Sequence, residues 1–323
     1  MATRKTRNLA PKYSIGEWFG KRMDDLTPTE RVSFAEKAHM RAEDANVFCP
    51  FRSQFFGRDM ACNKAGGVCT IAQYTQDETN TVTIADEGAC VCPIRLLDTN
   101  VFKRVGEAVL GSQHPWVVRE VPFLQNAVQN EQGQNAKAGR IDFVIVDNVD
   151  RNNWCAVETQ AVYFSGDNMG IEFDAISSAG GGLIHPVGQR RPDYRSSVPK
   201  RLSPQLMLKA PHLGRGKQIA VIVDKFVQRQ MADLVEAHVD AKGMSPEEHR
   251  QEKLALSQVV WFFVELPGGR PALVVEEAYT SLTSSVRALD SANPIPANRF
   301  SASLGALIED QDQRGEKVLR LFD

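Results

Sequence analysis

The chain has 323 residues, of which 24% are charged and 42% hydrophobic, and its formal net charge is −2. This length predicts about two domains, and the composition excludes a disordered protein or one that coats nucleic acid by bulk charge. The longest apolar run, Val259 to Val264, is far shorter than the roughly 18 residues of a membrane-spanning helix, so we expect no membrane association.

The N-terminal segment is basic but has no apolar stretch of the kind found in a secretory signal. We therefore expect a cytoplasmic protein whose cysteines are thiols or metal ligands before they are disulfides. Five of the six cysteines lie in the first hundred residues, where few strand-like runs occur. Strand-like runs become frequent after Gly111. We therefore predict an N-terminal domain over residues 1–112 and a second domain over 113–323.

The cysteines stand at positions 49, 62, 69, 90, 92 and 155. Turn-forming Pro50, Gly66, Gly67 and Pro93 lie beside several of them, so the chain can close around one ion. Four thiolates in a tetrahedron suit zinc or iron, and the chemistry does not choose between them. The two CxxC knuckles of a clear metal site are missing, and buried free thiols or disulfides remain alternatives.

Beyond Gly111, short β-branched or aromatic runs predict strands. They are 117–121, 141–146, 154–159, 219–223, 259–266 and 272–275. Helical periodicity covers 226–239 and 279–289, and Ser245 followed by Pro246 marks a further helix start. The Gly, Pro and Ser content of residues 177–201 predicts a long loop. Strands and helices are thus mixed, as in an α/β or α+β domain.

One charged residue, Asp142, stands inside an apolar strand, and Glu158 and Gln160 lie in the next strand. Because strand side chains alternate, Glu158 and Gln160 share a face, and a neighbouring strand can bring Asp142 beside them. Two carboxylates and an amide form an oxygen-rich site suited to Mg²⁺. Glu120 is a third candidate from a preceding strand. The pattern is common by chance, and exposed edge-strand residues are the alternative.

Two segments are basic. Residues 1–22 carry six Lys and Arg side chains and one Glu, and residues 188–217 carry eight and one Asp. They are either solvated loops or surfaces that contact phosphate. The candidate DNA contacts are Arg190, Arg191, Arg195, Lys200 and Arg201. The sequence has no HExxH, G-x-S-x-G, GxGxxG or GxxxxGK[ST] motif, which argues against zinc hydrolases, serine hydrolases, dinucleotide enzymes and P-loop proteins.

Taken in order, these motifs resemble the NotI family of type II restriction endonucleases. The opening Gly16-Glu17-Trp18-Phe19-Gly20-Lys21-Arg22 is similar to the start of that family. Cys49, Cys62, Cys69 and Cys92 match its four-cysteine iron site, with Cys90 as a possible substitute. Asp142 and Glu158-Thr159-Gln160 match its catalytic Asp and E-x-Q triplet, and Glu120 matches its upstream Glu with a segment of different length before Asp142.

The resemblance implies an α/β fold with a PD-(D/E)xK restriction-endonuclease-like core, a mixed sheet flanked by helices, and a small N-terminal metal-binding domain. It further implies a structural iron, with zinc as the alternative, and a homodimer that cuts double-stranded DNA with Mg²⁺ at a specific palindromic site. A GC-rich site is one option.

In this hypothesis Asp142, Glu158 and the Thr159 carbonyl hold Mg²⁺, Glu120 completes its shell and Gln160 orients water. Two other functions stay open: a non-catalytic, metal-stabilised DNA-binding protein, and a DNA-repair nickase on the same fold.

Overall fold

The computed structural model describes residues 10–129, 135–290, 295–310 and 318. Residues up to Asp290 form one compact unit and residues 291–323 form a second. The predicted boundary between residues 112 and 113 falls inside the first unit, so the division into two domains there stays a prediction. No helix in the described part of the chain is both long and apolar enough to span a membrane.

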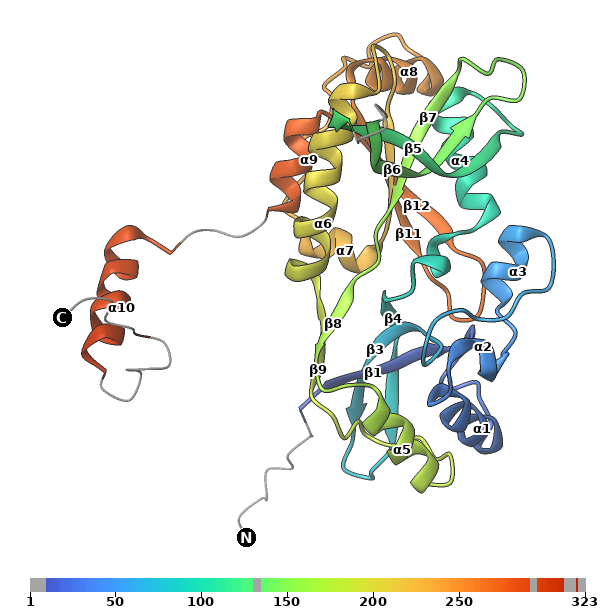
Figure 1. Cartoon of the computed structure of the whole chain (residues 1–323), viewed down its shortest axis with the longest axis vertical. Helices are drawn as coiled ribbons and strands as arrows, with labels where there is room; N and C mark the ends of the chain where they lie inside the picture. The colour runs from blue at the N-terminus through green and yellow to red at the C-terminus, as the bar shows by residue number, and fades with distance from the viewer. Residues whose placement is uncertain (1–9, 130–134, 291–294, 311–317, 319–323) are drawn as a thin grey trace. The chain divides into compact units, whose positions relative to one another are not determined.

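The first unit contains a six-stranded mixed sheet with strand order β12-β11-β10-β7-β6-β5 (Figure 1). Its strands are β5 (Trp116–Gln129), β6 (Asn135–Val146), β7 (Trp154–Thr159), β10 (Ile219–Asp224), β11 (Val259–Glu265) and β12 (Leu273–Thr280). Strands β7, β10 and β11 run parallel, and the other neighbours pair antiparallel. All six predicted strands are confirmed, as is a mixed α/β fold.

A second sheet is antiparallel, with order β2-β1-β3-β4. Its strands are β1 (Lys12–Trp18), β2 (Lys21–Arg22), β3 (Val68–Gln76) and β4 (Val82–Cys90), and a separate ribbon pairs β8 (Tyr163–Gly166) with β9 (Arg190–Asp193). The helices of this unit are α1 (Pro28–Ala38), α2 (Ala42–Ala45), α3 (Pro50–Phe56), α4 (Thr99–Leu110), α5 (Gly170–Ser178), α6 (Tyr194–Lys209), α7 (Lys225–Gln230), α8 (Pro246–Leu256) and α9 (Leu282–Leu289), with 3₁₀ turns η1 (Pro93–Leu96) and η2 (Ala210–His212).

Helices cover both faces of the mixed sheet. Side chains of α4, among them Phe102, share one apolar cluster with Phe143 and Val157 of the sheet. Helix α6 packs Leu202 and Leu206 into the cluster on the other face, together with alternate residues of β10 and β11. Strand β10 is buried along its whole length because both its faces are covered, which explains its continuous apolar sequence.

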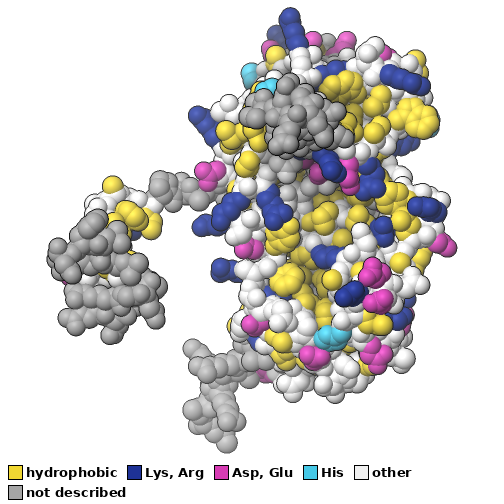
Figure 2. Space-filling view, in the orientation of Figure 1, with side chains coloured by type: hydrophobic (Ala, Val, Ile, Leu, Met, Phe, Trp, Pro, Cys, Tyr) yellow, Lys and Arg dark blue, Asp and Glu magenta, His cyan; other side chains and the backbone are white. Residues whose placement is uncertain are grey.

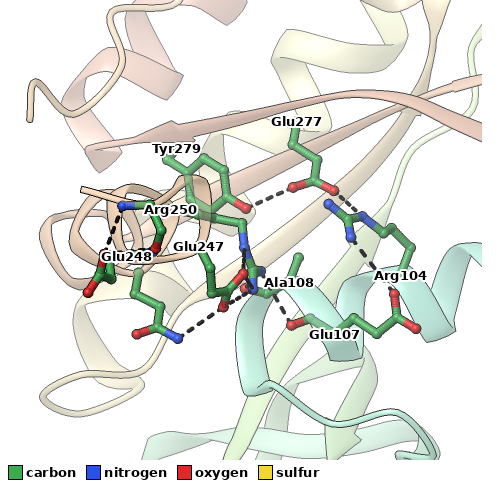
Figure 3. Close-up of polar contacts among 10 residues, drawn as sticks. Arg104, Glu107, Ala108, Glu247, Glu248, Arg250, Glu277 and Tyr279 are labelled. Carbon is green, nitrogen blue, oxygen red and sulfur yellow. Dashed lines mark hydrogen bonds and ion pairs between the residues drawn. The ribbon is translucent and has the colours of Figure 1, made fainter. Parts of the chain in front are cut away.

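Helix α8 is attached by a polar network (Figure 3). The guanidinium of Arg250 donates to the carbonyl of Ala108 (2.6 Å), in the last turn of α4, and pairs with Glu247 in its own helix (2.6 Å). Positive charge at a helix C-terminus is favourable because the free carbonyls there are partly negative. Arg104 and Glu277 form a second ion pair that ties α4 to β12. These contacts fix the edge of the mixed sheet farthest from β5.

The two sheets of the first unit are joined by buried polar contacts. The backbone N–H of Cys90 donates to the Asp224 carboxylate at the end of β10 (2.6 Å). Glu17 of β1 pairs with Arg95 (2.8 Å), and both side chains are almost fully buried. Burial raises the pKa of Asp224 to about 6, against hydrogen bonds from the N–H groups of Cys90 and Val227 that lower it. The cysteine-rich segment therefore packs directly against the mixed sheet.

Two sequence predictions of secondary structure are wrong in part. The helix predicted over 226–239 stops at Gln230, because the following chain instead bonds to β12 and α9, for example from Ala237 N–H to Tyr279 O (2.8 Å). The loop predicted over 177–201 contains β9 and the start of α6. The Asp193 side chain caps that helix at Ser196 N–H (3.0 Å). The predicted helix after Ser245 is confirmed, with a complete capping box.

The second unit contains helix α10 (Ala297–Glu309). Four large apolar side chains on it are exposed: Phe300, Leu304, Leu307 and Ile308. They follow the i, i+4, i+7, i+8 spacing of one helix face. The basic residues Arg4, Lys5 and Arg7 lie outside the described residues.

Candidate active site

Glu120, Asp142 and Glu158 stand at neighbouring positions of the adjacent strands β5, β6 and β7. Glu120 faces Asp142, because the pairs on either side of them in β5 and β6 are Arg119 with Phe143 and Val121 with Ile141. The β6–β7 ladder ends with the pair Phe143 and Val157, and Asp142 and Glu158 are the next residues of the two strands, where their carboxylates interact. Directly opposed residues of neighbouring strands point to the same face, so the backbone itself brings two of the predicted catalytic acids together.

A local hydrogen bond fixes the Asp142 carboxylate. The backbone N–H of Thr159 donates to its Oδ2 (3.2 Å), across from β7. This N–H lies at the end of β7, where the ladder with β6 has stopped and the donor is free for a side chain. Asp142 is thus held beside the residue that follows Glu158.

Glu120 adopts an unusual backbone. Its φ is 50°, in the left-handed region that costs a non-glycine residue about 1–3 kcal/mol. Its carboxylate is exposed and pairs with Arg140 (3.0 Å). Strain of this kind is found most often at functional sites, which favours a functional role for Glu120.

Two of these acids, Glu120 and Asp142, line a cleft of about 740 Å³, whereas Glu158 is buried and does not line it. Its walls include Glu120, Asp142, Thr159 and Gln160. Basic side chains also line it: Lys64, Arg119 and Arg201. A cleft lined by both carboxylates and cations fits a phosphodiester, whose oxygens need positive charge around a metal-binding centre.

Glu158 is buried (1% exposed) and pairs with a lysine. Lys209 Nζ lies 2.5 Å from Glu158 Oε1. Burial, together with the nearby Asp142, raises the pKa of Glu158 to about 7, and Lys209 acts in the opposite direction. Gln160 lines the cleft and donates from Nε2 to the Ala161 carbonyl (2.5 Å). Its amide is neutral, so the E-x-Q triplet itself supplies no cation.

The four cysteines of the predicted metal site are brought close together. Cys62 and Cys49 lie beside a short backbone bridge between Phe48 and Ala61. The Cys92 N–H donates to the Cys69 carbonyl (3.2 Å), which joins the second pair. The Cys62 thiol lies beside Cys49 and lowers the pKa of Cys49 to about 6. Cys69 interacts electrostatically with both Cys92 and Cys49.

The donor chemistry of this cluster fits a thiolate-bound ion. Cys49 and Cys92 each precede a proline and begin a helix or 3₁₀ turn. The Arg52 N–H donates to the Cys49 sulfur (3.5 Å), and such N–H donors stabilise thiolates. Among the described residues, however, no group of three or more His, Cys, Asp or Glu side chains is arranged to hold an ion as it stands. The metal therefore remains a proposal, both here and at the carboxylates.

The remaining cysteines, Cys90 and Cys155, are directed toward the mixed sheet rather than toward the other four sulfurs. Cys90 directs its sulfur to the Cys92 carbonyl (3.2 Å), and it packs with Cys155 in the apolar cluster on the α4 face. All six cysteines are free and buried, so the structure contains no disulfide.

The structure separates the predicted DNA contacts. Arg190 is buried and pairs with Glu172 (2.8 Å, side chains 0% and 2% exposed). It therefore stabilises the interior of the fold, and its burial argues against the predicted contact with DNA. Arg191, Arg195 and Lys200 are exposed. Arg201 reaches the cleft, where its guanidinium lies over the Tyr163 ring. Figure 2 shows Lys and Arg side chains on the face that carries α6.

Sequence reasoning missed three basic residues of the site. Lys64 follows Cys62 in a loop, and Arg119 precedes Glu120 in β5; both line the cleft. Lys209 lies in the basic segment 188–217, but nothing in the sequence indicates its role. A helical reading of 194–209 would have placed Arg201, Gln205 and Lys209 on one face, because they recur every four residues.

Comparison with known proteins completes this picture. A family model described as restriction endonuclease NotI matches residues 31–279. SfsA from Pyrococcus furiosus, solved in complex with Ca²⁺, is 14% identical; the alignment covers 66% of this chain and 78% of that chain, with a TM-score of 0.24. No curated protein matches the chain. The matched region contains the carboxylate row, the four cysteines and the cleft, and the class it defines is a nuclease that binds and cleaves DNA. The chain belongs to the NotI restriction endonuclease family.

Proposed function

We propose that this protein is a type II restriction endonuclease that hydrolyses both strands of double-stranded DNA at a specific palindromic site, with Mg²⁺ as cofactor. The observation that carries the proposal is the placement of Asp142 between Glu120 and Glu158 on neighbouring strands β5, β6 and β7, with Glu120 and Asp142 lining a cleft that Arg119 and Arg201 also line. We further propose that this sheet is the PD-(D/E)xK core and that the enzyme acts in the cytoplasm.

Asp142, Glu158 and the Thr159 carbonyl would hold Mg²⁺, with Glu120 as a further ligand. Bound there, Mg²⁺ lowers the pKa of a water molecule and neutralises charge that builds on the phosphate. Thr159 N–H fixes the Asp142 carboxylate. Gln160 orients water with its amide, because it has no charge with which to do more. Arg201 and Arg119 bind phosphates along the cleft.

We propose a structural role for iron, with zinc as the alternative, at Cys49, Cys62, Cys69 and Cys92. Cys92 and Lys64 line the cleft, so an ion there would hold one wall of the active site. Four thiolates leave no open coordination position for catalysis. A two-fold symmetric DNA site is matched most simply by a two-fold dimer, so we propose a homodimer.

The test is incubation of the purified protein with unmethylated phage and plasmid DNA, with Mg²⁺ and with EDTA, followed by sequencing of the ends. Discrete fragments that need Mg²⁺, with both strands cut, support a type II enzyme. Cuts in one strand alone indicate a nickase. Intact DNA together with specific binding in a shift assay indicates a non-catalytic DNA-binding protein, and either of these results contradicts the proposal.

A further inference from the structure

Lys209 is a buried cation in contact with the carboxylate of Glu158. It is the last residue of α6, and its Nζ contacts Glu158 Oε1 (2.5 Å) and Gln205 Oε1 (2.7 Å). Its side chain is 5% exposed. A lysine is rarely buried to this extent unless it is paired, and its partner here is the glutamate of the E-x-Q triplet.

Helix α6 is placed so that its polar face meets the cleft. Arg201, Gln205 and Lys209 recur every four residues on that face, and Arg201 and Gln205 line the cleft. The adjacent face is anchored in the core through Leu202 and Leu206, both at most 1% exposed. The helix therefore delivers Lys209 to a fixed position from 51 residues away in the chain.

The carboxylate centre needs a cation at this point. Glu158 is buried beside Asp142, and two negative charges at close range repel each other. The residue two positions after Glu158, Gln160, is neutral. Within the described part of the site, the ammonium group of Lys209 is the positive charge in direct contact with Glu158.

We propose that Lys209 supplies from α6 the positive charge that the E-x-Q triplet lacks at position 160, and so acts as a positioning residue that fixes the Glu158 carboxylate beside Asp142. This inference rests on the proposed nuclease function. It makes α6 part of the active site, where one face binds phosphate through Arg201 and balances the carboxylates through Lys209.

The test compares Lys209→Met, Lys209→Arg and the double variant Gln160→Lys/Lys209→Met with the unmodified enzyme. We measure kcat and KM for cleavage, the Kd for DNA in Ca²⁺, and the melting temperature. We expect Lys209→Met to lower kcat about 100-fold, the size of losing one electrostatic group at a reacting centre, with KM and Kd unchanged. Lys209→Arg should retain more activity. The double variant Gln160→Lys/Lys209→Met should have a kcat at least tenfold higher than that of Lys209→Met.

The control is Lys253→Met, which breaks a Lys–Glu pair with Glu236 (3.2 Å) away from the cleft. Its kcat should equal that of the unmodified enzyme. The inference is overturned if Lys209→Met cleaves at the normal rate, if it loses DNA binding as strongly as cleavage, or if Gln160→Lys recovers nothing.

If the unmodified protein cleaves no DNA, the proposed function fails, and melting temperatures still test the pairing. If the double variant Lys209→Met/Glu158→Gln lowers the melting temperature by less than the two single variants do in sum, the two side chains act as a pair. Additive losses overturn the inference.

Discussion

Glu120 and Asp142 face each other across β5 and β6, and Glu120 reaches that position with a left-handed backbone. An edge strand that simply followed its ladder would not need this conformation. The strain is stored at the point where the carboxylate row begins, as expected for a residue held in place for function.

The first prediction concerns that strain. Glu120→Gly should be more stable than Glu120→Ala by about 1 kcal/mol, because glycine accepts a positive φ without a steric penalty. Both variants should lose cleavage activity to a similar extent. Chemical denaturation of the two proteins measures the difference, and equal stability would show that the backbone is not strained at Glu120.

The second prediction concerns pH. The pKa of Glu158 is raised to about 7 in the folded protein, against an ordinary value of 4.5. The folded state therefore holds this proton more tightly than the unfolded state, and the associated stability is lost as pH rises from 4.5 to 7. Compared with Glu158→Gln, the wild type without bound Mg²⁺ should lose roughly 3 kcal/mol of its free energy of unfolding between pH 4 and pH 8. A difference that does not change with pH contradicts this.

The third prediction separates the two cysteine groups. Cys62→Ser should abolish bound metal and lower the melting temperature, because three thiolates cannot complete the tetrahedron. Cys90→Ala should keep one metal ion per chain, since its sulfur faces the Cys92 carbonyl rather than the cluster. Elemental analysis by mass spectrometry gives the content and identifies iron or zinc. A fully stable, metal-free Cys62→Ser protein would refute the structural role.

The fourth prediction contrasts two arginines. Arg201→Ala should weaken DNA binding, because Arg201 lines the cleft. The slope of the logarithm of the binding constant against the logarithm of the salt concentration should become shallower by about one, the contribution of one phosphate contact. Arg190→Ala should cost about 3–5 kcal/mol of stability, since it leaves Glu172 buried without its partner. Binding titrations over a range of salt concentrations, with parallel denaturation, distinguish them. A change of salt dependence in a folded Arg190→Ala protein contradicts the burial argument.

The strands and the carboxylate row could be predicted from the sequence because their signals are local. Residues 219–223 form an uninterrupted apolar run rich in β-branched side chains. Such a run is typical of a strand that is buried on both faces, as β10 is. Asp142 stood out as a single charge in such a run. Its juxtaposition with Glu158 required only that the two strands be neighbours, and they are.

Helix α6 and Lys209 could not be predicted in the same way. Pro199 and Pro204 lie inside that helix, and they made its sequence resemble a loop. The apolar spacing of Val198, Leu202 and Leu206, which buries one face, outweighs the two lost N–H donors. The Lys209–Glu158 contact depends on tertiary packing, and composition says nothing about it. The same holds for Arg190 of β9, whose burial depends on its ion pair with Glu172 in α5.

The most direct test of the account compares the wild type with Asp142→Asn. Asparagine keeps an oxygen for the Thr159 N–H but removes the charge, so the fold and the cleft should be retained. Cleavage of unmethylated DNA in Mg²⁺ and DNA binding in Ca²⁺ are measured on the same preparations. The account predicts that the wild type cuts DNA into discrete fragments, while Asp142→Asn binds the same site and leaves the DNA intact. Cleavage by Asp142→Asn at the wild-type rate would contradict it.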